Sequence, residues 1–109
     1  MLFHPSVESI DLVTVLSALA DPVRLQVVRY IADDQPHSCG EVPTTLSAAS
    51  MSRHFRILRE AGVIMTTPAG KHRLLTLRRH DLDSRFPGLL ALVGALPAGL
   101  SEERCVGPV

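Results

Sequence analysis

Residues 47–64, SAASMSRHFRILREAGVI, contain the local signals of a capped amphipathic helix. Ser47 can cap the first turn, because a serine hydroxyl accepts a hydrogen bond from the backbone N–H groups that a helix start leaves unpaired. Met51, Phe55 and Leu58 follow at i, i+4 and i+7, the spacing of one helix face that packs on a core. Gly62 is placed to end the helix as its left-handed C′ residue. The stretch therefore predicts a helix from Ser47 to Gly62 with one buried stripe.

The opposite side of this helix carries small residues followed by arginines: Ala49, Ser50, Arg53 and Arg56. Small residues allow a helix to approach the major groove closely, and an arginine fork can bond a base edge through two hydrogen bonds. Arg59 and Glu60 lie further along the helix, and we expect them to be solvated or paired with each other.

Charge is unevenly distributed along a chain whose formal net charge is zero. Residues 47–80 contain seven basic residues and one acidic residue, a net +6, whereas residues 1–46 and 81–109 carry −4 and −2. A basic segment between two acidic ones is typical of a protein that meets a polyanion with one face. An ordinary solvated surface would give the same charge count.

The flanking sequence predicts a mainly α fold with a small β-hairpin. Residues 10–20 form a first helix, and Asp21-Pro22 caps and starts a second helix that reaches about Ala32. Pro43 limits residues 37–46 to a short third helix or a turn. After the helix at 47–61, residues 63–67 and 72–77 are two β-prone runs joined by a Pro/Gly turn, which indicates a hairpin with Lys71, His72 and Arg73 at its tip. A closing helix starts near His80 and is interrupted at Phe86-Pro87.

The length of 109 residues fits one domain, which we expect to span residues 10–97. Residues 1–9 would then be an N-terminal arm and residues 98–109 a disordered tail. The longest apolar run, residues 88–96, is much shorter than the roughly 20 residues of a membrane span. The first residues lack the basic and apolar regions of an export signal, so a soluble cytoplasmic protein without membrane contact is expected.

Two blocks of sequence resemble the ArsR/SmtB family of bacterial repressors. They are residues 19–25, Leu-Ala-Asp-Pro-Val-Arg-Leu, and residues 52–64, which resemble the family's recognition helix and its entry into the wing. The resemblance covers residues 10–96, and residues 81–89 are similar to the last helix of actinobacterial members. It implies a winged helix-turn-helix in the order of four helices, two strands and a final helix.

The resemblance also implies a homodimer that reads a palindromic double-stranded DNA operator with two recognition helices. The residues expected to face DNA are Ser50, Ser52, Arg53, His54, Arg56, Lys71, His72 and Arg73. For His54 a structural role in the core has equal weight. The first and last helices would form the dimer interface, which agrees with their excess of apolar residues. The interface candidates are Leu12, Val15, Leu16, Leu89, Leu92, Val93 and Leu96.

Many family members are released from DNA by a metal, but both familiar ligand patterns are broken in this sequence. One thiol, Cys39, stands where the family has a pair, and Asp83 and Gly94 occupy the positions of two histidines on the last helix. If a metal site exists, His4, His37 and Cys39 are its best candidates, and imidazole with thiolate would suit nickel or zinc. A separate effector protein or oxidation of Cys39 would serve as the alternative signal.

Two other classes of function fit the sequence less well. The sequence contains no phosphate-binding glycine loop, no nucleophile elbow and no His-Glu-x-x-His, so an enzyme is not expected. A winged helix used only to dock proteins is the alternative to a DNA-binding regulator. The arginines at Arg53 and Arg56 favour DNA, because a docking face would carry apolar anchors there.

Overall fold

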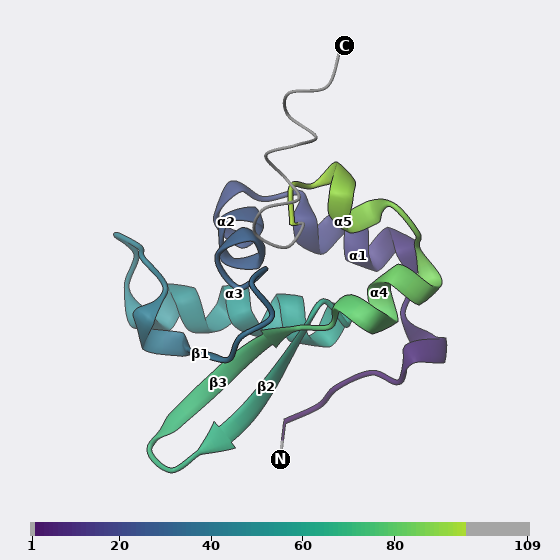
Figure 1. Cartoon of the computed structure of the whole chain (residues 1–109). Helices are drawn as coiled ribbons and strands as arrows, with labels where there is room; N and C mark the ends of the chain where they lie inside the picture. The colour runs from purple at the N-terminus through teal and green to yellow at the C-terminus, as the bar shows by residue number, and fades with distance from the viewer. Residues whose placement is uncertain (1, 96–109) are drawn as a thin grey trace.

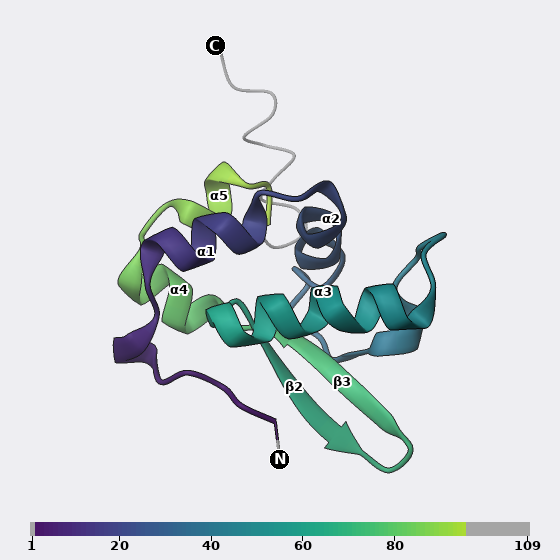
Figure 2. The same cartoon turned by 180° about the vertical axis from the view of Figure 1, so that it is seen from behind.

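The computed structural model describes residues 2–95, which form five α-helices, a three-stranded antiparallel sheet and two single turns of 3-10 helix (Figures 1 and 2). In chain order the elements are η1 (Val7–Ser9), α1 (Leu12–Leu19), α2 (Pro22–Tyr30), β1 (His37–Ser38), η2 (Cys39–Glu41), α3 (Ala48–Ala61), β2 (Ile64–Ala69), β3 (His72–Leu77), α4 (Arg79–Arg85) and α5 (Leu89–Leu92). The predicted fold class, a mainly α winged helix-turn-helix, is confirmed.

Helix α3 forms as its sequence predicts. The Ser47 hydroxyl accepts a hydrogen bond from the Ser50 N–H at 3.1 Å, and Gly62 ends the helix in the left-handed region at φ 89°. Met51, Phe55 and Leu58 are all buried in the core. The helix is therefore fixed on one side and leaves the opposite side free.

Helices α1 and α2 hold α3 in place from one side. Carboxylates cap both, since Asp11 accepts from the Thr14 N–H and Asp21 from the Val23 and Arg24 N–H groups. The Arg24 guanidinium then joins the three helices: its Nε donates to the Ala18 carbonyl at 2.6 Å, and its Nη1 lies 3.2 Å from His54 Nδ1. Arg24 thus links α1, α2 and α3 through one side chain.

The hairpin of β2 and β3 projects away from the helices as a wing, as both views of the cartoon show (Figures 1 and 2). Ala69 pairs with His72, so Gly70 and Lys71 form a two-residue turn, and Gly70 has the positive φ of 61° that this tight connection needs. Strand β1 adds to the other edge of β3 through the His37–Leu75 and Ser38–Leu74 pairs. Because Lys71 lies in the turn, the wing presents its basic residues at its far end.

Residues 37–46, where a short third helix or a turn is expected, contain a two-residue strand, which is not predicted, and a single 3-10 turn that Ser38 and Glu41 close as a capping box. The third of the four helices that the family resemblance implies is therefore reduced to this turn. The closing helix is two helices, because the chain breaks at Phe86-Pro87 and Gly88 takes a left-handed φ of 91° before α5. The interruption itself agrees with the sequence-based expectation. The expected tail at residues 98–109 lies outside the described residues.

Replacing Gly62 with alanine is expected to lower the free energy of unfolding by about 1–3 kcal/mol, the cost of holding a residue with a Cβ in the left-handed region. A Cβ at this position would also lie 2.6 Å from Cγ1 of Ile10, which is itself buried. Urea unfolding followed by circular dichroism measures the change. Gly40→Ala is the control, because a Cβ added at Gly40 would have no other atom within 4 Å. Equal losses in the two variants would contradict this account of Gly62.

Candidate nucleic-acid interface

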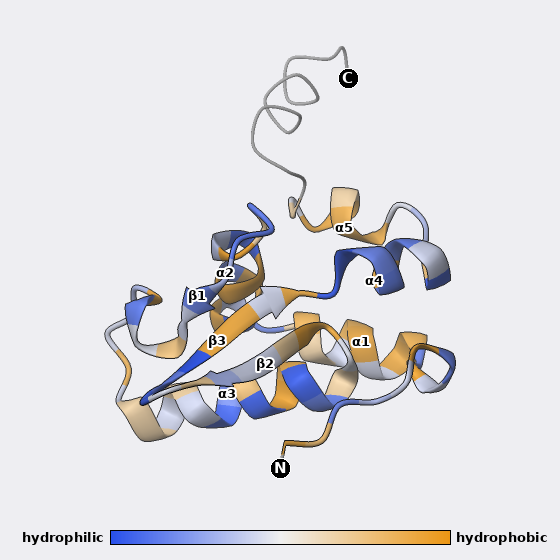
Figure 3. Cartoon of the chain, turned by 60° about the horizontal axis from the view of Figure 1, so that its bottom comes forward, coloured by the Kyte–Doolittle hydropathy of each residue, from blue (hydrophilic) through white to orange (hydrophobic). Residues whose placement is uncertain are grey.

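The free face of α3 carries most of the predicted DNA contacts. Ser52, Arg53 and Arg56 are exposed, and Ser50 is half-buried near the start of the helix. All four lie away from the stripe that packs on the core. The hydropathy colouring in Figure 3 shows hydrophilic residues recurring along this helix and again toward the tip of the wing.

A hollow between α3 and β3 gathers arginines from both elements. Its lining consists of one alanine, one serine and four arginines: Ala49, Ser52, Arg53, Arg56, Arg59 and Arg73. Arginine guanidinium groups bind phosphate oxygens through paired hydrogen bonds, and a helix and a strand that supply them together suit the backbone of a nucleic acid. This hollow is the clearest polyanion-binding feature of the fold.

The wing extends the basic surface. Lys71, His72 and Arg73 are exposed at its end. Within residues 2–95, no carboxylate lies within 4.0 Å of the charged groups of Arg53, Arg56, Lys71 or Arg73. These cations are therefore available to an external anion.

Two basic residues counted in the +6 segment have internal partners instead. Arg78 is buried, and it bonds the Asp81 carboxylate at 2.9 Å and the Pro5 carbonyl at 2.8 Å. Arg79 pairs with Asp34 at 2.8 Å. The charge count of the sequence thus overstates the positive charge that faces outward, although the remaining arginines still gather on one side.

His54 does not lie on the free face. Its side chain is buried, with 8% of the residue exposed, and its Nδ1 lies next to the Arg24 guanidinium. The expectation that His54 faces DNA is therefore corrected in favour of the structural role. Its position three residues after Met51 and one before Phe55 places it at the edge of the buried stripe.

Arg59 is the residue that sequence reasoning misses. The sequence-based expectation is a side chain that is solvated or paired with Glu60, but Arg59 is 9% exposed and its Nε has no hydrogen-bond partner among the described residues. The spacing contains the signal, since Arg59 follows Met51 by eight residues and Phe55 by four and so belongs to the buried stripe. An arginine at such a position is easily assigned to solvent because charged residues are rarely buried.

The three metal candidates do not come together. Nε2 of His4 accepts a hydrogen bond from the Thr66 N–H at 3.0 Å, whereas His37 lies between Asp33 and Glu41 with both ring nitrogens bonded. No group of three histidine, cysteine, aspartate or glutamate side chains within residues 2–95 has the arrangement of a metal site. These residues do not fit the nickel or zinc that the family resemblance suggests.

The His37 cluster makes stability depend on pH. Hydrogen bonds that His37 donates to the carboxylates of Glu41 and Asp33 raise the pKa of His37 above its ordinary 6.5, and His37 in turn lowers the pKa values of both carboxyls. The stabilisation from a raised histidine pKa is complete below 6.5 and is lost as the pH rises through the folded value. The carboxylates stabilise the fold above their ordinary pKa values of 3.8 and 4.5 and lose this effect in acid.

The His37→Gln variant is therefore expected to remove a decline in the free energy of unfolding that the wild-type chain shows from about pH 6.5 upward. Urea unfolding at several pH values between 5.5 and 8.5, about the range where histidine titrates, measures this decline. His80→Gln is the matched control, because His80 is exposed and forms no ion pair among the described residues. A wild-type curve that stays parallel to that of His37→Gln would show that the cluster does not titrate as described.

Cys39 has the environment of an unreactive thiol. It is half-buried, and burial raises its pKa above the ordinary value despite the opposing influence of Arg73 and Arg59. The thiolate is the reactive form of cysteine, so a raised pKa disfavours reaction at neutral pH. This argues against oxidation of Cys39 as the primary signal.

The dimer candidates differ in how far they are exposed. Leu12, Leu16 and Leu92 are exposed by 43%, 45% and 81%, and Val13, which is not among the predicted residues, is exposed by 71%. Val15 and Leu89 are instead buried in the chain's own core and are removed from the candidate interface. Val93 is half-buried, and Leu96 lies outside the described residues.

Among residues 2–95, no helix combines the length and apolar character needed to cross a bilayer.

Comparison with known proteins indicates the family to which the chain belongs. A family described as a helix-turn-helix domain matches residues 19–67. The HTH-type transcriptional regulator YceK of Bacillus subtilis (strain 168) is 32% identical over 79 residues, which cover 70% of this chain and 79% of YceK.

Solved structures agree with this assignment. Reduced HlyU from Vibrio cholerae N16961 matches with a TM-score of 0.59 and 28% identity, over 73% of this chain and 85% of HlyU. The crystal structure of an ArsR family transcriptional regulator shares the fold with a TM-score of 0.61 and 24% identity, over 74% of this chain and 90% of that chain. Together with the capped helix and the basic wing, these matches show that the chain belongs to the HTH-type transcriptional regulators and has the winged helix-turn-helix fold of an ArsR family regulator.

Proposed function

We propose that the protein is a repressor that binds a palindromic DNA operator as a homodimer, with α3 in the major groove and the wing on the flanking backbone. The observation that carries the proposal is the hollow lined by Ser52, Arg53, Arg56, Arg59 and Arg73. It combines guanidinium groups from α3 with one from the wing, and within residues 2–95 none of them forms an ion pair. Such a group of cations suits a phosphate backbone beside a groove.

Arg53 is the proposed base-reading residue. It is exposed on the outer face of α3, one turn after Ala49 and Ser50, whose small side chains allow the start of the helix to lie deep in the groove. The guanidinium fork fits the two acceptors of a guanine. Ser50 and Ser52 are short donors for phosphates or base edges, while Arg56 and the wing residues Lys71, His72 and Arg73 bind phosphates.

The exposed apolar residues of α1 and α5 supply the proposed dimer contact. Leu12, Val13 and Leu16 lie on α1 and Leu92 on α5, and all four are exposed. Clusters of exposed apolar residues are typical of protein interfaces. A two-fold dimer through this surface would place its recognition helices in successive major grooves, about 34–36 Å apart.

Lys71→Ala is expected to weaken binding to all DNA sequences alike and to reduce the slope of log affinity against log salt by about 1 for each wing that contacts DNA. Mobility-shift titrations between about 50 and 200 mM salt measure the slope. Arg79→Ala is the control, because Arg79 is already paired with Asp34 and its loss should leave the slope unchanged. A Lys71→Ala slope equal to that of the wild type would remove the wing from the interface.

Repression is tested with a reporter gene whose promoter overlaps the DNA site selected by the purified protein. The proposal predicts lower reporter expression when the protein is present and restored expression with the Arg53→Ala variant. An increase in expression with the wild-type protein would show activation instead.

A further inference from the structure

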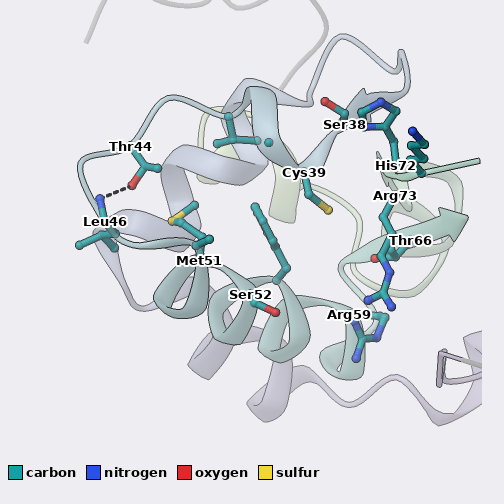
Figure 4. A pocket seen from close by; sticks show the side chains of 15 residues that line it. Ser38, Cys39, Thr44, Leu46, Met51, Ser52, Arg59, Thr66, His72 and Arg73 are labelled. Atoms are coloured by element: carbon teal, nitrogen blue, oxygen red, sulfur yellow. Dashed lines mark hydrogen bonds between the residues drawn. The ribbon is translucent and has the colours of Figure 1, made fainter. Parts of the chain in front are cut away.

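A second cavity, open to solvent on one side, lies beside the DNA-facing hollow and is lined by residues of η2, α3 and the wing (Figure 4). Its volume is about 510 Å³, within the range of roughly 300–1,000 Å³ that is typical of small-molecule sites. One part of its wall is apolar and includes Val42, Leu46, Met51 and Phe55. The cavity is therefore large enough, and apolar enough, for an organic ligand.

The opposite end of the cavity is polar and positively charged. Figure 4 shows Arg59, Thr66 and Arg73 gathered at this end, away from Leu46 and Met51, with Cys39 between the two groups. A ligand with an apolar body and an anionic group at one end would match the apolar end and the positively charged end of this cavity. A bare phosphate would leave the apolar end unused.

Two buried polar atoms at the charged end lack partners. Arg59 Nε and Thr66 Oγ1 are the buried side-chain nitrogen and oxygen atoms without a hydrogen bond in residues 2–95, and both residues line this cavity. Arg59 is 9% exposed and Thr66 is 4% exposed. A buried polar atom without a hydrogen-bond partner is costly, so an external group that bonds Arg59 Nε and Thr66 Oγ1 would stabilise both.

The neighbouring groups do not neutralise Arg59. Within the described part of the chain no carboxylate lies within 4.0 Å of it. Burial and the charges of Arg59 and Arg78 lower the pKa of His4, and burial raises the pKa of Cys39, so both are uncharged at neutral pH. The positive charge of Arg59 and Arg73 is left for a ligand.

We propose that this cavity binds a small amphipathic carboxylate, whose oxygens accept hydrogen bonds from Arg59 and Thr66 and whose apolar body lies against Met51 and Phe55. The ligand would act as an effector. Ser52, Lys71 and Arg73 line this cavity and also belong to the proposed DNA contacts. An anion bound there offsets part of the positive charge that these residues present to DNA, and it restricts the side-chain conformations that they can adopt for DNA contact. This coupling, unlike the binding itself, rests on the proposed function.

The test uses octanoate as the probe and the DNA-free, full-length protein. Titration followed by amide NMR is expected to shift the resonances of Cys39 and Thr66, which line the cavity. Arg59→Met is expected to weaken octanoate binding about tenfold to a hundredfold, the effect of losing a hydrogen bond to a charged group. Thr66→Val keeps the side-chain shape, removes the hydroxyl and is expected to weaken binding about fivefold.

Three controls make the test specific. Arg56→Met removes an exposed arginine of the same helix that does not line this cavity, so octanoate binding should not change. Octanol lacks the charge and inorganic phosphate lacks the apolar body, so both should bind at least about tenfold more weakly than octanoate. The proposed site would be overturned if octanoate failed to bind, or if Arg59→Met and Thr66→Val both bound octanoate as tightly as the wild-type protein does. It would also be overturned if octanol or inorganic phosphate bound as tightly as octanoate.

The coupling to DNA is measured separately. Saturating octanoate is expected to lower the affinity for the selected DNA site about tenfold, and DNA must lower octanoate affinity by the same factor. Octanoate binding without any change in DNA affinity would retain the site and reject its effector role. A protein that binds octanoate but no DNA would reject the proposed function and leave the cavity assignment standing.

Discussion

The Leu92→Glu variant is expected to be monomeric and to bind the operator about 10²–10⁴-fold more weakly than the wild-type chain. Leu92 is 81% exposed on α5 in the single chain, so the substitution removes no core contact. In a dimer the same carboxylate would be buried without a partner, which is costly. Without the second subunit each half-site is bound singly, and the gain from linking two binding events is lost.

Light scattering at micromolar concentration and mobility-shift titration measure the two effects. Gln35→Glu adds the same charge at an exposed position outside the apolar surface of α1 and α5, and it should remain dimeric with nearly unchanged affinity. A Leu92→Glu protein that stays dimeric would place the subunit contact elsewhere. A wild-type protein that is monomeric would reject the dimer itself.

Arg53→Ala is expected to reduce operator affinity by about 1–3 kcal/mol per half-site and to relax the base preference at one position of each half-site. The reason is the exposed location of Arg53 on the face of α3 opposite Met51 and Phe55, where no internal anion among the described residues holds it. Competition binding with each base substituted in turn measures both quantities.

Arg53→Lys separates base reading from charge. Lysine keeps the positive charge but loses the planar fork. The variant should therefore retain non-specific affinity while losing preference at the same position. If both variants keep the wild-type base preference, Arg53 contacts only the backbone and another residue reads the sequence.

Local signals make α3 and the wing predictable from the sequence. The Ser47 cap, the stripe of Met51 and Phe55 and the left-handed Gly62 each act within a few residues, and the structure shows all of them as predicted. The turn at Gly70 is equally local. Sequence patterns of this kind carry information because the helix and hairpin geometries fix which residues face the same way.

Features that depend on distant contacts are not predictable in the same way. Strand β1 is only two residues long and exists because His37 pairs with Leu75. Arg78 and Arg79 look free in the sequence, but Pro5 and Asp34, which bond them, are 73 and 45 residues away. Because α1 is apolar on more than one side, the sequence alone assigns Val15 to the dimer contact. The packing of α1 against α3 determines which side is covered, and it buries Val15 within the chain.

The burial of Arg59 is the most consequential of these differences. The four-residue spacing from Phe55 places Arg59 on the buried face of α3, whereas its charge favours exposure to solvent. Nothing else in the sequence decides between these two expectations. The structure reconciles the two by placing Arg59 at a cavity, close to Thr66 and Arg73, where a mostly buried side chain still has polar surroundings.

Selection of bound DNA from a random pool tests the central claim most directly. The claim is that a dimer reads DNA through two copies of α3, so the enriched sequences should contain an inverted repeat whose half-site centres are about one helical turn, roughly 34–36 Å, apart. The same selection with Arg53→Ala should lose preference at one position of each half-site. Enrichment of no sequence at moderate salt, or of a site without two-fold symmetry, would contradict the account.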